Sequence, residues 1–118
     1  MVDGANVVGS RPDGWWKDRP GATRRLHEQL LVADTEYDEV VLVLEGAAKR
    51  GVPAGRDHHV RTVHAPRDGD STIVAETKAA LGAGSTVTVV SADRVLGGAV
   101  AHVGALAMSP SWLLAQLH

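Results

Sequence analysis

The feature of this sequence that most constrains its fold is an apolar run followed by an acid, which occurs four times. The run at Thr86–Val90 is rich in β-branched residues, as in a strand buried on both faces, and Ser91 and Asp93 follow it. The same order recurs in MVDGANVV, VVLVLEG and VRTVHAPRDGD. Carboxyl ends of parallel strands lie along one edge of an open α/β sheet. We therefore predict that four acids meet in one pocket there: Asp3, Glu45, Asp70 and Asp93.

The segments between these runs predict a single α/β domain over residues 1–118. Helices should flank a mostly parallel central sheet of about five strands, which makes a three-layer sandwich. The first strand should lie within Met1–Val8; either it runs on through Asn6–Val8 or a few preceding residues are missing. The other predicted elements are a helix from Pro20 to about Val32, a strand at Glu39–Leu44, a helical turn at Ala47–Arg50, an edge strand at Asp57–Ala65, a helix from Asp68–Thr72 to Gly82, a helix at Asp93–Val103 broken or closely packed at Gly97–Gly98, a strand at Leu106–Met108 and a terminal helix at Trp112–Leu117.

The composition excludes several classes of protein. The sequence has no cysteine, which rules out disulfides, thiolate metal ligands and a cysteine nucleophile. It contains no nucleotide P-loop, no dinucleotide fingerprint and no G-x-S-x-G elbow. No apolar run approaches the ~20 residues of a transmembrane helix, and no basic-then-apolar leader opens the chain. We therefore expect a soluble, cytoplasmic protein that does not contact a membrane.

The formal net charge is −2, but the basic residues are concentrated in two segments. Gly9–Arg25 holds five basic residues and two acids, and Lys49–Arg61 holds four basic residues and one acid. Such loops beside an acidic pocket would suit a phosphodiester polymer, with Arg11 and Lys17 as candidate phosphate-binding residues; the alternative is that they are solvated loops. Trp15 and Trp16 could stack on bases, or one of them could cover the core.

The four acids suit the binding of a divalent cation. Asp70 and Asp93 could serve simply as helix caps, whereas Asp3 and Glu45 end apolar strands, where a charge helps neither sheet nor cap. Grouped carboxylates repel one another unless a cation neutralises them, and Mg²⁺ or Mn²⁺ prefers such oxygen ligands. Three polar residues could assist by contacting a carboxylate, a water or a phosphate: Asn6, Ser91 and Arg94. A zinc site at His58, His59 and His64 is disfavoured, because adjacent strand residues point to opposite faces.

Four motifs, in order, resemble the NYN branch of the PIN-like nuclease superfamily, and YacP-type NYN proteins in particular. They are VDGANVVG, VLVLEG, the DGDSTIV helix start and VVSADR, and the resemblance extends to the closing SPSWLL. It implies a Rossmann-like parallel sheet and Mg²⁺- or Mn²⁺-dependent cleavage of RNA by an acidic cluster. Asp3, Asn6, Asp70 and Asp93 match family positions, with Ser91 in the hydroxyl place of the last motif.

This sequence departs from the family pattern at three places. Glu45 stands where the family often has an aspartate. Ser71 stands where many relatives carry a second acid, which would reduce the number of ligands or shift a role onto Asp68. The first strand is also short.

The preferred hypothesis is a divalent-metal-dependent endoribonuclease that acts on single-stranded or structured RNA. Its catalytic and metal-binding residues would be Asp3, Glu45, Asp70 and Asp93, with Glu45 as a ligand or as the base that orients water. One alternative is a degenerate family member that binds RNA or a ribosomal partner without cutting it. The other is a metal-dependent phosphohydrolase that acts on nucleotides. Whether the protein forms a homodimer is left open.

Overall fold

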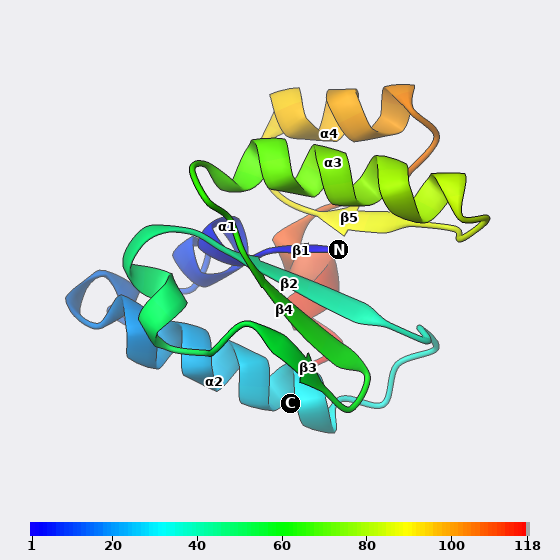
Figure 1. Cartoon of the computed structure of the whole chain (residues 1–118). Coiled ribbons are helices and arrows are strands. Elements are labelled where there is room, and N and C mark those ends of the chain that lie inside the picture. The colour runs from blue at the N-terminus through cyan, green and yellow to red at the C-terminus, as the bar shows by residue number, and fades with distance from the viewer. Residues whose placement is uncertain (118) are drawn as a thin grey trace.

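A six-stranded sheet runs through the centre of the protein in the computed structural model, which describes residues 1–117 (Figure 1). The strands are β1 (Val2–Asp3), β2 (Val40–Leu44), β3 (Gly55–Asp57), β4 (Val60–His64), β5 (Thr88–Val90) and β6 (Leu106–Met108), and their order across the sheet is β3-β4-β2-β1-β5-β6. All neighbours pair in parallel except β3 and β4. The prediction of a mostly parallel sheet is confirmed, with six strands where about five were expected.

The additional strand is β3, which forms an antiparallel hairpin with β4. His58 lies in the turn at φ 53°, a left-handed conformation that reverses the chain. The prediction that Asp57–Ala65 is an edge strand was wrong, because β4 lies between β2 and β3. All three residues of β3 are exposed, so the segment has no apolar pattern by which the sequence could reveal it.

The first strand contains only two residues, Val2 and Asp3, and helix α1 (Gly4–Gly9) begins immediately after it. The prediction that the strand runs on through Asn6–Val8 was wrong. Val7 and Val8 are buried, but on a helix, because the Asp3 carboxylate caps the first turn by accepting from the Asn6 N–H. Gly4 lets this turn lie directly against β2: a Cβ there would be 2.8 Å from the Val43 carbonyl oxygen.

The sheet separates two apolar cores. Successive side chains of β2 point to opposite faces of the sheet, and all five are apolar, so both faces must be covered. Val40, Leu42 and Leu44 belong to the core beneath α1, α2 (Arg19–Val32) and α5 (Pro110–Leu114). Val41 and Val43 belong to the core beneath α3 (Gly69–Gly82) and α4 (Arg94–His102). Figure 1 shows α3 and α4 together on one face of the sheet and α2 on the other, which confirms the three layers.

The helix boundaries agree with most of the sequence expectations. Pro20 lies in the first turn of α2, and Asp68 caps α3. α4 continues through Gly97–Gly98 without a break; a Cβ on Gly97 would lie 3.6 Å from the Ala107 Cβ, so the helix packs closely against β6 there. α5 begins at Pro110 and ends at Leu114, short of the predicted Leu117. Two 3₁₀ helices, η1 (Trp15–Lys17) and η2 (Gly46–Arg50), lie in the connections.

Within residues 1–117, no helix is both long enough and apolar enough to cross a membrane.

Candidate acidic site at the carboxyl edge of the sheet

Asp3 is the most buried of the four candidate acids, with 3% of its surface exposed. Its Oδ2 accepts hydrogen bonds from the Asn6 Nδ2 at 2.9 Å and from the Ser91 Oγ at 2.8 Å. Ser91 Oγ in turn accepts from the Asp93 backbone N–H at 3.1 Å. A single serine hydroxyl therefore connects the end of β1 to the start of α4, two segments that are far apart in the sequence.

Asp93 is the N-cap of α4, and this role uses one of its two carboxylate oxygens. Oδ1 accepts from the Val95 N–H at 2.9 Å and from the Leu96 N–H at 3.1 Å, whereas Oδ2 accepts no hydrogen bond from the described residues. Arg94 follows at the first position of the helix and is exposed. The cap fixes where the Asp93 carboxylate lies and leaves one oxygen available to a ligand.

Glu45 and Asp70 complete the edge from β2 and α3. Glu45 Oε2 accepts from the Gly69 N–H at 2.8 Å, which ties the end of β2 to the first residue of α3. Asp70, one residue further along, is exposed and accepts no hydrogen bond from residues 1–117. Asp68 caps the same helix by accepting from Ser71 N–H and Oγ, and these bonds lower the pKa of Asp68.

The electrostatics of Asp70 show that these acids are neighbours. Partial burial raises the pKa of the Asp70 carboxyl, and four surrounding negative charges raise it further: Asp93, Asp3, Asp68 and Glu45. Asp70 also lies in the first turn of α3, where the helix dipole favours a negative charge. The raised pKa nonetheless reflects desolvation first and the neighbouring carboxylates second. The edge thus accumulates more negative charge than its own residues neutralise.

Whether these acids could hold a cation depends on their donor atoms and on how those atoms are arranged. Carboxylate oxygens are the ligands that Mg²⁺ and Mn²⁺ prefer, and Asp70, Asp93 Oδ2 and Glu45 Oε1 are free of hydrogen bonds from the described residues. In the part of the chain that the structure describes, however, no three His, Asp or Glu side chains converge in a group that could hold a metal ion. The donor chemistry fits a hard cation, and binding one would require side-chain rotations at this edge.

The candidate phosphate-binding residues and the other basic residues differ in their partners. Arg11 donates to the Gln29 Oε1 at 2.6 Å and so lies against α2, while Lys17 ends η1 and is exposed. In the second basic segment, Arg56 pairs with Glu39, and Arg61 pairs with Glu76 at 3.3 Å. These ion pairs neutralise two of the four basic residues of Lys49–Arg61. Gly9–Arg25 is therefore the better candidate for a surface that contacts an anion.

Two of the three histidines considered for a zinc site have structural partners. The His59 Nε2 lies 3.0 Å from the Leu30 carbonyl oxygen, and the His64 Nε2 lies 2.7 Å from that of Val52. Each ring nitrogen is thus occupied by the backbone of a neighbouring segment. These contacts support the structural role that the sequence favoured over a zinc site.

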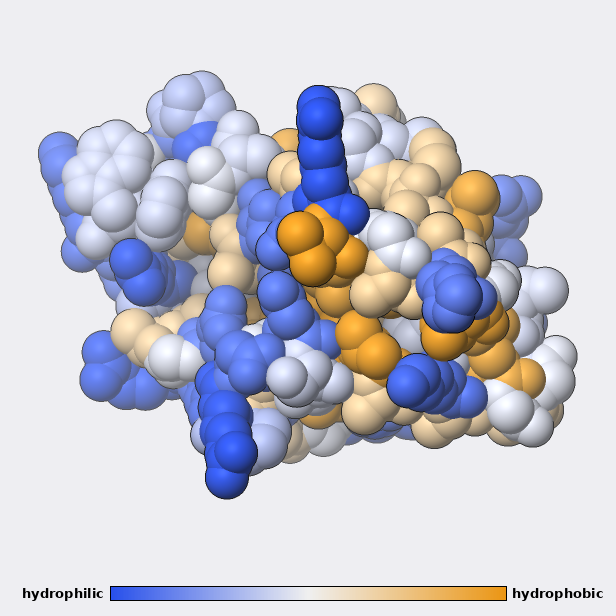
Figure 2. All heavy atoms as spheres, turned by 90° about the horizontal axis from the view of Figure 1, so that it is seen from above, coloured by the Kyte–Doolittle hydropathy of each residue, from blue (hydrophilic) through white to orange (hydrophobic). Residues whose placement is uncertain are grey.

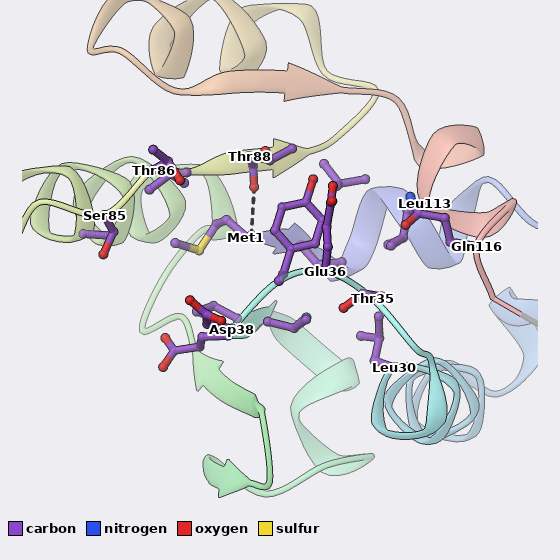
Figure 3. Close-up of a pocket in the computed structure, with 18 of the residues that line it drawn as sticks. Met1, Leu30, Thr35, Glu36, Asp38, Ser85, Thr86, Thr88, Leu113 and Gln116 are labelled. Carbon is purple, nitrogen blue, oxygen red and sulfur yellow. Dashed lines mark hydrogen bonds between the residues drawn. The ribbon is translucent and has the colours of Figure 1, made fainter.

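The largest hollow described, of about 550 Å³, lies at the opposite edge of the sheet, where the strands begin (Figure 3). Its lining includes Met1, Thr35, Tyr37, Thr86 and Trp112, and Tyr37 and Trp112 meet edge to face at 6.2 Å. A second hollow lies beside Ser71, Thr72, Ala75 and Glu76. Neither is lined by any of the four acids. No sequence signal singled out the larger hollow, because its lining comes from several strands, helices and loops, and none of them carries a chemical motif there.

The fold and this edge together define a class: a one-sheet, mostly parallel α/β sandwich with acids at the carboxyl ends of its strands. A solved structure with a similar fold is that of a single-substitution mutant of Rae1 (YacP) from Bacillus subtilis. The TM-score is 0.72 and the identity 21%, and the match covers 97% of this chain and 70% of that one. No protein-family model and no curated protein matches the sequence. The similarity shows the fold, and YacP is also the type of protein that the sequence motifs resemble.

Proposed function

We propose that this protein is a divalent-metal-dependent endoribonuclease whose active site is the acidic edge. The observation that carries the proposal is the accumulation of charge around Asp70. The acids there come from four separate segments of the chain, and desolvation together with repulsion by these acids raises the pKa of Asp70. The caps and the Glu45–Gly69 hydrogen bond explain where single carboxylates lie, but not why four of them are neighbours. We therefore attribute their grouping to chemistry. The motif resemblance and the similarity to Rae1 (YacP) support the same proposal.

The residues of the edge have distinct roles in this proposal. Asp70, Asp93 and Asp3 would hold Mg²⁺ or Mn²⁺, with Glu45 as a further ligand or as the base that orients water. When bound, such a cation supplies activation of a water and neutralisation of phosphate charge. Ser91 and Asn6 hold the Asp3 carboxylate in one orientation. Arg94, exposed beside Asp93, would pair with a phosphate oxygen of the RNA.

The exposed edge suits a polymer better than a small substrate. Pockets for small molecules are concave and enclose most of the ligand, and neither hollow described above is lined by these acids. An RNA strand can instead lie across an open edge. We therefore do not carry the nucleotide phosphohydrolase forward. The degenerate binding module remains the second candidate, because no three acids of the described chain converge to hold a metal.

The test is cleavage of labelled RNA with Mg²⁺ or Mn²⁺ by the wild type and by Asp93→Asn. Asparagine caps a helix about as well as aspartate, so this variant keeps α4 intact and removes only the charge. We expect cleavage by the wild type and a loss of at least about 100-fold in the variant, because a charged ligand has been removed. Asp34→Asn, an exposed acid outside the edge, is the matched control and should cut normally. Intact RNA with the wild type in both metals would overturn the nuclease in favour of the binding module.

A further inference from the structure

Trp16 is a large aromatic side chain that the fold leaves in solvent. It is 59% exposed, although tryptophan is one of the residues that proteins bury most extensively. Its neighbour Trp15 packs against the apolar core beneath α2. This is the core-covering role that the sequence analysis considered for one of the two tryptophans. The two rings meet edge to face, with centroids 6.0 Å apart at 89°. Trp15 therefore contacts Trp16 edge to face, while more than half of the Trp16 surface stays accessible.

Local hydrogen bonds hold the segment that carries Trp16 in one conformation. Gly14 adopts φ 76°, which favours glycine, and its carbonyl accepts from the Lys17 N–H at 3.0 Å to form η1. The Asp18 carboxylate then accepts from the Gly21 N–H at 3.0 Å and starts α2. The Arg19 guanidinium lies 5.3 Å from the centre of the Trp15 ring. Trp16 is thus exposed on a structured support.

The surroundings of Trp16 carry an excess of positive charge. Lys17, Arg19 and Arg24 are all exposed. Of the two acids in Gly9–Arg25, Asp13 lies 3.8 Å from Arg25 and Asp18 caps α2. An exposed aromatic side chain in a segment with exposed cations is complementary to a nucleotide, which offers a base to stack and a phosphate to pair.

The Trp16 segment also lies at the same edge of the sheet as the acids. Only α1, whose six residues span roughly 9 Å, and the short connection Ser10–Gly14 separate it from Asp3. Figure 1 shows α1 and the following blue loop at the end of the sheet where α3 begins. A strand of RNA that crosses the acidic edge could therefore extend to Trp16.

We infer that Trp16, with Lys17 and Arg19 beside it, is a stacking platform for an unpaired base of single-stranded RNA next to the acidic edge. This inference rests on the proposed function, since it takes RNA as the substrate of that edge. It narrows the substrate to single-stranded RNA, because a base inside a duplex is already stacked and its face is covered. Stacking tolerates every base, so we infer little sequence preference at this position.

The first experiment measures binding of a short labelled oligouridylate in the Asp93→Asn background, which keeps the RNA intact. Trp16→Ala should weaken binding by about 5- to 150-fold, the range that alanine substitution of a stacking aromatic gives. Trp16→Phe should restore most of the affinity. Leu106→Ala is the matched control, because Leu106 on β6 is also 59% exposed and lies away from this segment. It should bind as the parent does.

A second measurement separates stacking from a general loss of affinity. Oligouridylate should quench tryptophan fluorescence in the parent, and the quenching should fall in Trp16→Phe although that variant still binds. Duplex RNA should bind the parent and Trp16→Ala equally. Unchanged oligouridylate affinity in Trp16→Ala, or an equal loss on single strands and duplexes, would overturn the inference.

The proposed function and this inference can fail separately. If the wild type leaves RNA intact in both metals while oligouridylate binding still depends on Trp16, the proposed nuclease activity is wrong. The stacking role of Trp16 would then belong to a protein that binds RNA without cutting it. If the wild type cuts RNA and Trp16→Ala cuts it with the same KM and kcat, the nuclease stands and the platform is wrong.

Discussion

Asp70 is the residue at which the proposed chemistry and the stability of the fold oppose each other. Its folded-state pKa is raised above the ordinary value of 3.8, first by partial burial and then by the surrounding acids. The native state therefore holds this proton more tightly than the unfolded chain does. Stability attributable to Asp70 is fully present below pH 3.8 and is lost as pH rises through the raised pKa.

Asp70→Asn should consequently stabilise the protein at neutral pH in the absence of divalent cations. The amide keeps the size of the side chain and removes the charge that its neighbours repel. The gain should be largest near pH 7 and should vanish on acidification below pH 3.8, where the wild-type carboxyl is protonated as well. Urea unfolding of both proteins across this pH range, with EDTA present, measures the difference. Asp34→Asn controls for the loss of one charge, and an equal gain there would contradict the assignment to Asp70.

At the scale of elements, the sequence predicted those parts of the fold whose side chains show a clear period or cap. The five buried residues of β2 and the capping aspartates of α3 and α4 are of this kind. Asn6–Val8 was one of two alternatives for completing the first strand, because two adjacent valines fit either a strand or a buried helical turn. The choice depends on the contact between Asp3 and Asn6 and on the approach of Gly4 to β2, which are tertiary facts. The β3 hairpin was missed because its residues face solvent.

Two glycines in helices should respond oppositely to substitution by alanine. Gly98 lies inside α4, where a Cβ would meet nothing within 4 Å, so Gly98→Ala should stabilise the protein by about 0.5–1 kcal/mol. A Cβ on Gly4 would lie 2.8 Å from both Val43 O and Leu44 Cδ2, so Gly4→Ala must push α1 away from β2. We expect it to cost about 1–3 kcal/mol. Urea unfolding midpoints of the two variants give both values, and destabilisation by Gly98→Ala would contradict the unbroken α4.

At the scale of the whole molecule, the two edges of the sheet differ in character. The carboxyl edge is open and acidic, whereas the opposite edge holds the hollow lined by Tyr37 and Trp112. From the sequence, the prediction of a parallel sheet was enough to place Asp3, Glu45, Asp70 and Asp93 along the first edge. The carboxyl ends of parallel strands all lie at the same edge of a sheet. The sequence could not fix side-chain orientation, which depends on partners such as Ser91 and Gly69 from distant segments. It placed the acids at one edge but gave no means of telling whether their oxygens converge.

The remaining prediction concerns the stability of the whole molecule in the presence of a divalent cation. An ion that binds only the folded state raises the free energy of unfolding by about 2.7 kcal/mol when its concentration is about 100 times its Kd. For a domain of roughly 100 residues, this raises Tm by roughly 10–20 °C. We therefore expect Mn²⁺ or Mg²⁺ to raise the Tm of the wild type strongly, and to leave that of the double variant Asp70→Asn/Asp93→Asn nearly unchanged.

The control for this experiment is a second double variant, Asp34→Asn/Glu36→Gln. It removes the same charge from exposed acids in the connection that leads into β2, at the opposite edge of the sheet. Its Tm should rise with the cation as that of the wild type does. Samples without the divalent cation receive sodium chloride to the same ionic strength. A similar rise in all three proteins would mean that the cation only screens charge, because general screening does not depend on which acids are present. The acidic edge would then not be a metal site, and the binding module would become the better reading of this fold.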